Sequence, residues 1–394
     1  MVRASARHPA TARAVASFNV LISESVPDDS KKILIACGGT GGHLFPGIAV
    51  AESLREAGHD ALLLISRKEI DARATAGHEH LAFETVPAIA KPPVFSPRTP
   101  LFLWKLASSI RHARRLIRAN RIDVVLGMGG FTSLPPVYAG HRLGLPTFIH
   151  DSNARPGRAN ILTSRFCSRV LLGMDAAREW FPNAACETTG TPVRPEILAP
   201  PARAEAAAKF GLDPAKTTLL VTGGSQGARR LNEIAAEAAN RLPETIQILH
   251  IAGPANEATV KAALAGRPGA VALGFCDAMD TALAAADAVV ARSGASFLTE
   301  AAAAGLPCIL VPYPHAADDH QTANARVFER AGAAVVVPEP ELDAEKLASL
   351  AVSILGDPDR RSAMAAAARA LAVPDAAARV RDAVLTALTR KAAA

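Results

Sequence analysis

Residues Lys31 to Leu54 read KKILIACGGTGGHLFPGIAVAESL. A short apolar run ends in five glycines between Gly38 and Gly47, and an apolar-periodic segment follows, which predicts a buried strand, a glycine-rich turn and a helix. Such a turn brings a ligand close to bare backbone at a helix N-terminus, where phosphate or another anion is favoured. Tight packing of the strand against the helix would also require glycines. It would not require His43, which lies inside the turn.

Two common phosphate-binding motifs do not fit this turn. The dinucleotide pattern G-x-G-x-x-G fits only if His43 replaces the last glycine, and no acidic residue ends a strand about twenty residues later, where a ribose partner is expected. A Walker loop does not fit because no Gly-Lys-Ser/Thr follows. The turn alone therefore predicts a phosphate or a sugar held near backbone.

The composition predicts a two-domain α/β protein. The chain has 394 residues, enough for two cores, and 49% of them are apolar. Apolar runs, turns and periodic helices alternate along it, which indicates parallel sheets. No stretch of 18 residues is both apolar and free of charged residues, so no transmembrane helix is expected. Residues 1–30 lack a long apolar core with a cleavage site, so we expect a disordered tail there and no secretory signal.

The spacing of cysteines and histidines gives no indication of a metal site. The five cysteines are scattered without a C-x-x-C motif, which is typical of reduced, mostly buried residues in a cytosolic protein. The histidines include no H-x-x-x-H pair. We therefore expect no bound metal.

The net charge of +6 is concentrated between Arg98 and Arg121, where seven basic residues occur without an acid. Phe102, Leu103 and Trp104 lie at the start of this segment. A basic helix with an aromatic leading edge suits an anionic membrane surface. An amphipathic helix that packs on the sheet and leaves its arginines in water explains the pattern equally well, and both can hold. Nucleic acid is the weakest interpretation, because no basic stripe occurs elsewhere.

The chain divides into two halves that resemble each other. Strands are expected at 33–37, 61–65, 123–126, 146–150 and 169–172, and then at 217–222, 246–251, 270–273, 287–291, 308–311 and 334–337. The domain boundaries follow as 31–195 and 196–370, with a final helical segment at 371–394 that is able to pack on either half. The second half begins with its own strand, glycine turn and helix, TTLLVTGGSQGARRLNE. Two such units place a ligand cleft between their strand ends.

Polar residues with sugar- or phosphate-binding chemistry follow several predicted strands. Glu300 lies in the helix after strand 287–291, where its carboxylate could accept hydrogen bonds from a ribose diol. Gln321 and Asn324 share one helix face and suit sugar hydroxyls. Asn153 follows a strand of the first half, and Arg194 at the end of that half could face a diphosphate. Taken singly, each also fits an ordinary helix start or a solvated linker.

Seven segments together resemble one family, the bacterial peptidoglycan glycosyltransferases that add N-acetylglucosamine to undecaprenyl-diphosphate muramyl-pentapeptide and so convert lipid I into lipid II. The similarity is near-collinear from about Lys32 to Ala334. The segments are GGTGGHLFP, GMGGFTSLP, HDSNARPGRANILTSR, TGTPVR, GGSQGARRLNE, RSGASFLTEAAAAGLPCILVPYP and DDHQTANA. Seven blocks in the right order are far more specific than any one of them.

The resemblance implies a GT-B fold, with two Rossmann-like doubly wound domains that face each other across a cleft. The first domain would take the lipid acceptor and the second UDP-N-acetylglucosamine (UDP-GlcNAc), with inversion at the anomeric carbon and no cofactor. Other expected partners are the anionic membrane surface and other cell-wall synthesis or division proteins. The expected location is the cytoplasmic face of the bacterial inner membrane, as a peripheral protein.

The resemblance also assigns expected roles to residues. His43 is the candidate general base. The positions that match donor-contacting residues are Thr40, Gly41, Gly42, Asn153, Arg194, Ser225, Gln226, Cys276, Ala295, Ser296, Phe297, Leu298, Thr299, Glu300, Gln321 and Asn324. The acceptor positions are Gly41, His43, Gly129 and Gly130. The membrane positions are Phe102, Leu103, Trp104, Arg111, Arg114 and Arg115.

The chain departs from the family pattern at four places. The usual H-E-Q-N is HDSN here, the usual T-G-N-P-V-R has Thr191 for asparagine, Phe131 replaces a tyrosine, and Cys276 replaces a branched aliphatic residue near the uracil. Alternative functions are another GT-B transferase, a UDP-GlcNAc epimerase, or a non-catalytic nucleotide-sugar-binding subunit. The epimerase would require several acids near the anomeric carbon, and the binding subunit would be expected to lose the His43 turn.

Overall fold

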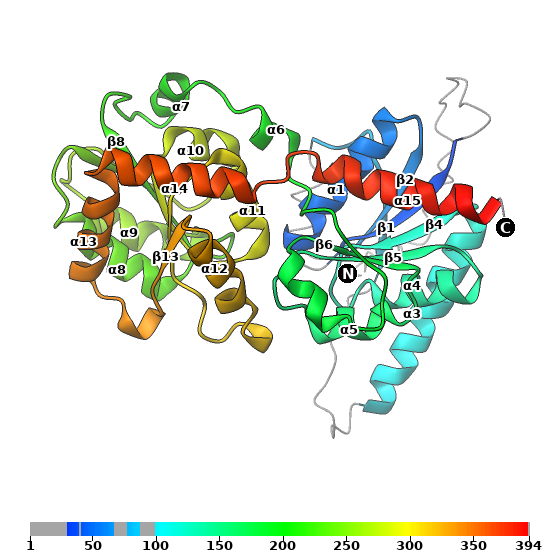
Figure 1. Ribbon diagram of the computed structural model, residues 1–394. Helices are drawn as coiled ribbons and strands as arrows, with labels where there is room; N and C mark the ends of the chain where they lie inside the picture. Colours follow the sequence, from blue (N-terminus) through cyan, green and yellow to red (C-terminus); the bar gives the residue numbers. More distant parts are fainter. Residues whose placement is uncertain (1–29, 39–40, 67–76, 87–98, 393–394) are drawn as a thin grey trace, which may run out of the picture.

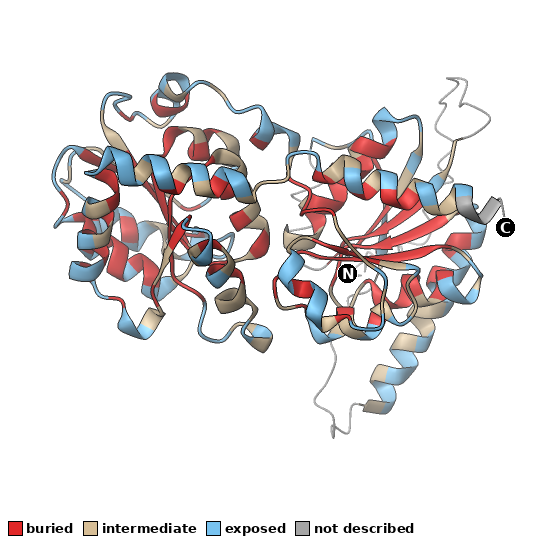
Figure 2. Ribbon diagram, viewed as in Figure 1, coloured by how far each residue is buried: buried red, intermediate tan, exposed pale blue. Residues whose placement is uncertain are grey.

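The computed structural model describes residues 30–38, 41–66, 77–86 and 99–392. The expected tail and Thr40 lie outside the described residues. Two α/β units lie side by side, each with a central sheet between helices (Figure 1). The apolar strands are buried and the outer helix faces are exposed (Figure 2). The expectation of two doubly wound domains is confirmed.

The first domain contains a seven-stranded sheet in which neighbouring strands run parallel. In spatial order the strands are β3 (Ala82–Val86), β2 (Asp60–Ser66), β1 (Lys32–Ala36), β4 (Val124–Gly127), β5 (Thr147–Asp151), β6 (Arg169–Leu172) and β7 (Cys186–Thr188). The strand order reverses between β1 and β4, which is where doubly wound sheets bind ligands at their carboxyl ends. β3 and β7 were not expected from the sequence, because one is an exposed edge and the other has only three residues.

Helices cover both faces of this sheet. They are α1 (Gly41–Glu56), α3 (Thr99–Ala119), α4 (Leu134–Arg142), α5 (Arg158–Ser164) and the short 3-10 helix η1 (Asp175–Trp180). α1 begins in the glycine turn after β1 and packs its apolar face into a core with Ile33, Ile35 and Leu126.

The second domain contains a six-stranded parallel sheet with the same kind of reversal, between β8 and β11. In spatial order its strands are β10 (Ala270–Leu273), β9 (Ile246–Ile251), β8 (Thr217–Thr222), β11 (Ala288–Ala291), β12 (Cys308–Leu310) and β13 (Ala334–Val336). All six agree with the expected positions within one residue. Its helices are α7 (Arg203–Lys209), α8 (Arg229–Ala239), α9 (Glu257–Ala263), α10 (Met279–Ala285), α11 (Ala295–Ala304), α12 (His320–Arg330), α13 (Ala344–Leu355) and α14 (Pro358–Leu371).

Two segments connect the domains. The short helix α6 (Pro195–Leu198) carries the chain from the first domain to the second. At the other end, α14 lies on the second domain and α15 (Ala376–Ala392) lies on the first (Figure 1). Val380 and Val384 of α15 are fully buried in the first domain's core, and the Arg381 guanidinium donates a 3.2 Å hydrogen bond to the Ser53 hydroxyl of α1.

Gly47 allows α1 to lie directly on β1. A Cβ at this position would lie 2.6 Å from the Cβ of Cys37. The position of that Cys37 atom is set by the backbone, so a change of rotamer cannot relieve the clash. We expect Gly47→Ala to destabilise the protein, because overpacking costs about 1–3 kcal/mol and the better helix propensity of alanine returns at most about 1 kcal/mol. Urea denaturation measures the difference.

A double-mutant cycle with Cys37→Gly supplies the control for the Gly47 prediction, because Cys37→Gly removes the Cβ with which the new alanine would clash. The loss in unfolding free energy of the double variant should be smaller than the sum of the losses in the two single variants. Full additivity would show that the destabilisation does not come from this contact.

Candidate active site between the two domains

His43 lies in the first turn of α1 and packs against the glycine turn that follows β4. A Cβ on Gly129 would lie 3.0 Å from the His43 Nε2 atom, and one on Gly130 would lie 3.1 Å from its Cε1 atom. Both glycines have positive φ angles, +111° and +73°, which other residues rarely adopt. The turn therefore needs glycine twice, for its backbone conformation and for the space that the imidazole fills. The expected catalytic and acceptor positions are brought together here.

A buried carboxylate supports this turn. Asp151, at the end of β5, is 1% exposed and accepts hydrogen bonds from the Asn153 backbone N–H at 2.9 Å and from Asn160 Nδ2 at 2.7 Å. The Asn160 side-chain oxygen in turn accepts the Gly130 N–H at 3.1 Å. Burial raises the pKa of the Asp151 carboxyl, and the hydrogen bonds from Asn153 and Asn160 oppose that shift. The sequence reasoning missed Asp151 and Asn160, although an acid at the end of a buried strand is a recognisable signal.

Asn324 of α12 joins the two domains. Its side-chain oxygen accepts the Ala154 N–H at 2.8 Å, and its amide nitrogen donates to Asn153 Oδ1 and to the Ser293 carbonyl, each at 3.1 Å. Asn324 is completely buried, and its amide oxygen and both amide hydrogens are engaged by protein groups at the junction of the domains. Asn153 is half-buried and lies at the same junction.

The N-terminus of α11 faces that of α1. The Ser296 hydroxyl donates a 3.0 Å hydrogen bond to the Gly42 carbonyl of the other domain. One turn further along α11, Glu300 accepts hydrogen bonds from Arg194 Nε and Nη2 at 3.1 and 2.9 Å. Burial raises the pKa of the Glu300 carboxyl, whereas the Arg194 charge and its hydrogen bond act to lower it.

Arg194 lies at the centre of this junction. Its guanidinium is 4.8 Å from the ring centroid of Phe45 in α1 and pairs with Glu300 in α11. Both side chains of the ion pair are mostly buried, with 19% and 12% of their surface exposed. A ligand that hydrogen-bonds to Glu300 must share that carboxylate with Arg194, and an anion beside Arg194 would meet a cation that is already positioned.

The other expected donor positions lie on loops and helix starts of the second domain. Ser225 and Gln226 are exposed in the glycine turn after β8, and Gln321 Oε1 accepts the Tyr313 N–H at 3.0 Å. Ala295 and Leu298 are buried, Phe297 and Thr299 are half-buried, and the Leu298 side chain belongs to the core, so only its backbone can face a ligand. Cys276 is half-buried, and burial raises the pKa of its thiol.

Arg292 was not expected as a site residue, although it opens the loop between β11 and α11. Its guanidinium donates to the Val311 and Pro312 carbonyls at 3.0 and 3.2 Å and pairs with Glu339. It lies 9% exposed between the two loops that precede α11 and α12. These bonds fix one loop against the other, and so position the helix that carries Glu300 relative to the helix that carries Gln321.

The expected membrane residues lie on α3 and differ in their exposure. Leu103 and Trp104 are 56% and 63% exposed, and the neighbouring Leu101 is 53% exposed. Phe102 instead faces the domain, with its ring centroid 5.5 Å from that of Phe131. Arg111, Arg114 and Arg115 are exposed further along the helix. In the described part of the chain, no helix is long and apolar enough to cross a bilayer.

Among the described residues, one group of three side chains has ligand atoms close enough together to hold a metal ion. It consists of Glu52 on α1 with His78 and His80 before β3. This group was not expected, because the two histidines are two residues apart and the carboxylate lies 26 residues before His78.

His150, beside Asp151 in β5, is fully buried, and burial lowers its pKa to about 4. Its Nε2 lies 3.0 Å from the Gly190 carbonyl. His150 therefore binds a proton near its ordinary pKa of 6.5 in the unfolded chain, but only near pH 4 in the folded protein. The free energy of unfolding consequently falls as the pH falls from about 6.5 towards 4. Between pH 7 and pH 5 we expect a loss of about 2 kcal/mol from this group. Urea denaturation at both pH values measures it.

The control for the pH prediction is His150→Gln, which retains a hydrogen-bond donor for Gly190 but does not titrate. Its unfolding free energy should depend less steeply on pH than that of the wild type. His250, whose pKa burial also lowers to about 4, keeps part of the slope in the variant. Equal slopes in the two proteins would contradict the assignment to His150.

Comparison with known proteins agrees with this geometry. The profile of the glycosyltransferase family 28 N-terminal domain matches residues 33–172, and that of the family 28 C-terminal domain matches residues 218–380. A UDP-N-acetylglucosamine--N-acetylmuramyl-(pentapeptide) pyrophosphoryl-undecaprenol N-acetylglucosamine transferase from Shewanella amazonensis is 38% identical over 362 residues, which are 90% of this chain and 98% of that protein. A transferase of the same name from Halorhodospira halophila is 40% identical, over 89% of this chain and 96% of that protein.

Solved structures show the same architecture. Acinetobacter baumannii MurG superposes with a TM-score of 0.71 at 28% identity, over 90% of this chain and 99% of that one. The glycotransferase of kitacinnamycin has a TM-score of 0.66 at 16% identity, which supports the shared two-domain fold alone. The fold is therefore GT-B, as expected. The chain belongs to glycosyltransferase family 28 and, within it, to the family of UDP-N-acetylglucosamine--N-acetylmuramyl-(pentapeptide) pyrophosphoryl-undecaprenol N-acetylglucosamine transferases.

Proposed function

We infer that the chain is a hexosyltransferase that moves N-acetylglucosamine from UDP-GlcNAc to the 4-hydroxyl of the muramyl sugar of lipid I, giving lipid II for peptidoglycan synthesis. The observation that carries this inference is the meeting of two helix N-termini where the domains face each other. α1 brings His43 and the first glycine turn from one domain, and α11 brings Ser296 and Glu300 from the other. Two reactants held by different domains can meet only there.

The donor is assigned to the second domain. The turn after β8 offers free backbone and the exposed Ser225, and α11 offers Glu300 as the acceptor for ribose hydroxyls. Gln321 lies at the start of α12, beside Tyr313, where an amide can bind sugar hydroxyls. Binding of the ribose requires Glu300 to share its carboxylate with Arg194, so the guanidinium would lie next to the diphosphate.

The acceptor is assigned to the first domain. Gly129 and Gly130 lie against the His43 ring, in a turn that Asp151 and Asn160 hold in place. In a single displacement the acceptor hydroxyl attacks the anomeric carbon, His43 takes the proton, and UDP leaves from the opposite face. The charge that develops on the leaving diphosphate is stabilised by helix N-terminal amides and by Arg194.

Replacement of His43 tests its proposed role as the general base. We expect His43→Ala to lower kcat for transfer of labelled N-acetylglucosamine to lipid I by about 100- to 10,000-fold, because a positioned base contributes that much. The dissociation constant of UDP should change little, since the nucleotide is assigned to the other domain. His112→Ala, at an exposed position on α3, is the matched histidine control and should retain the wild-type rate. A near-normal rate in His43→Ala would remove His43 from the role of base.

We also propose that α3 places the enzyme on the cytoplasmic face of the bacterial inner membrane as a peripheral protein. Leu101, Leu103 and Trp104 form an exposed apolar edge, and the exposed arginines follow on the same helix without an acid. Apolar side chains that enter the interface and cations that face anionic headgroups reinforce each other. This arrangement would bring the acceptor domain to the surface that holds the lipid substrate.

Vesicle sedimentation tests the proposal that α3 binds the membrane. Leu103→Glu with Trp104→Glu should reduce binding to vesicles of mixed anionic and neutral lipid by at least about tenfold, because two apolar side chains are lost from the interface. Val352→Glu, at a 40% exposed apolar position on the second domain, is the control and should bind like the wild type. Raised salt should weaken wild-type binding. Unchanged binding of the α3 variant would contradict the assignment.

A further inference from the structure

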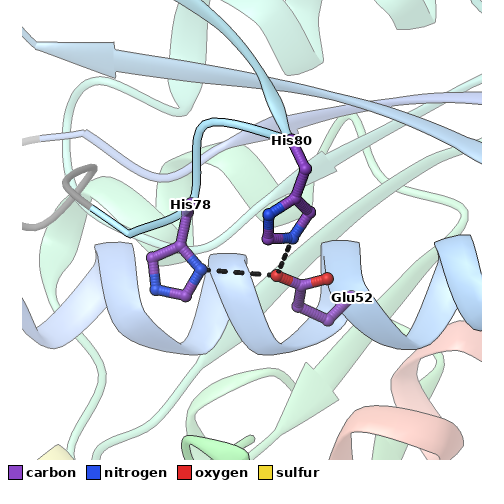
Figure 3. A group of neighbouring side chains, drawn as sticks. All are labelled: Glu52, His78 and His80. Carbon is purple, nitrogen blue, oxygen red and sulfur yellow. Dashed lines mark hydrogen bonds and ion pairs between the residues drawn. The ribbon is translucent and has the colours of Figure 1, made fainter.

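The side chains of Glu52, His78 and His80 in the first domain point toward one another (Figure 3). Glu52 projects from the middle of α1, and the two histidines come from the short segment that leads into β3. The Glu52 Oε1 atom lies 3.3 Å from His78 Nδ1 and 2.6 Å from His80 Nε2. The side chains of Glu52 and His78 are mostly buried, with 21% and 24% of their surface exposed.

We propose that these three residues form a Zn²⁺ site. Two imidazole nitrogens and a carboxylate oxygen are a donor set that zinc prefers, and all three ligand atoms lie within 4.8 Å of one another. Ligands about 2.0–2.1 Å from a tetrahedral ion are separated by roughly 3.3 Å, so the group needs shifts of only about an ångström or less to accept one. The fourth position is open to water.

The site would join two parts of the first domain. α1 is fixed by its packing against β1 and by α15, whereas β3 is an exposed strand that, within the described residues, pairs only with β2. A metal held by both elements ties the connection that leads into β3 to the core helix. Glu52 follows His43 by nine residues, which is about 14 Å along the helix, so the ion stabilises the domain and takes no part in sugar transfer.

The alternative is a carboxylate that accepts two hydrogen bonds from histidines and binds no metal. Glu52→Gln separates the two, because the amide oxygen still accepts hydrogen bonds but is a poor zinc ligand. His78→Ala with His80→Ala removes both nitrogen ligands. His112→Ala removes an exposed histidine elsewhere and is the matched control.

Titration calorimetry on the untagged full chain, after dialysis against EDTA and then against metal-free buffer, tests the proposal with Zn²⁺ as the probe. The wild type and His112→Ala should bind one equivalent, and Mg²⁺ should give no binding. Glu52→Gln and the double histidine variant should bind Zn²⁺ at least about 100-fold more weakly, since loss of an outer-shell partner alone costs 10- to 100-fold. Co²⁺ should give the visible absorption of a four-coordinate ion in the wild type and in His112→Ala, and should not give it in Glu52→Gln or in the double histidine variant.

Thermal unfolding gives a readout of folding. Zn²⁺ should raise the Tm of the wild type and of His112→Ala, and leave that of Glu52→Gln nearly unchanged. The proposal is overturned if the wild type binds no Zn²⁺, or if the Glu52 and histidine variants bind it as tightly as the wild type, which would place the ion at a cysteine or another surface group. Because none of these measurements uses the glycosyltransferase reaction, they stand apart from the test of catalysis.

Discussion

The structure depends on one constraint, which is that the carboxyl ends of two parallel sheets must face each other closely enough for helix N-termini to meet. The Ser296 hydroxyl donates to the Gly42 carbonyl, and Asn324 bonds to Ala154 and Asn153 on the opposite domain. These are polar contacts made by short side chains and backbone, so they hold only at close range. They fix the relative position of the turn that carries His43 and the helix that carries Glu300.

Both sides of the cleft are supported from behind by buried polar groups. In the first domain, Asp151 and Asn160 hold the glycine turn against which His43 packs. In the second, Arg292 joins the loops that precede α11 and α12. A buried carboxylate or guanidinium is costly unless its partners are complete, and therefore it fixes the geometry of whatever it binds. The Arg194–Glu300 pair has the same chemistry but lies where ligand groups can compete for it.

The sequence predicts most of the fold because parallel strands in α/β proteins are continuous apolar runs. Strands β8 to β13 are of this kind, and so is β1 with its glycine turn. β3 could not be found in this way, since its AFETV sequence is largely exposed at the sheet edge. The pairing of Arg194 with Glu300, 106 residues later, and the meeting of Glu52 with His78 and His80 result from topology and have no local pattern. The glycine turns can be recognised in the sequence, whereas pairings between residues far apart in the chain cannot.

The shared active site is tested most directly by the rate of UDP release from UDP-GlcNAc with and without lipid I. If the acceptor domain and the donor domain complete one active site between them, UDP should appear at a significant rate only when lipid I is present, with one lipid II formed for each UDP released. UDP release at the same rate without lipid I, or no release in its presence, would contradict the assignment of the cleft to this transfer.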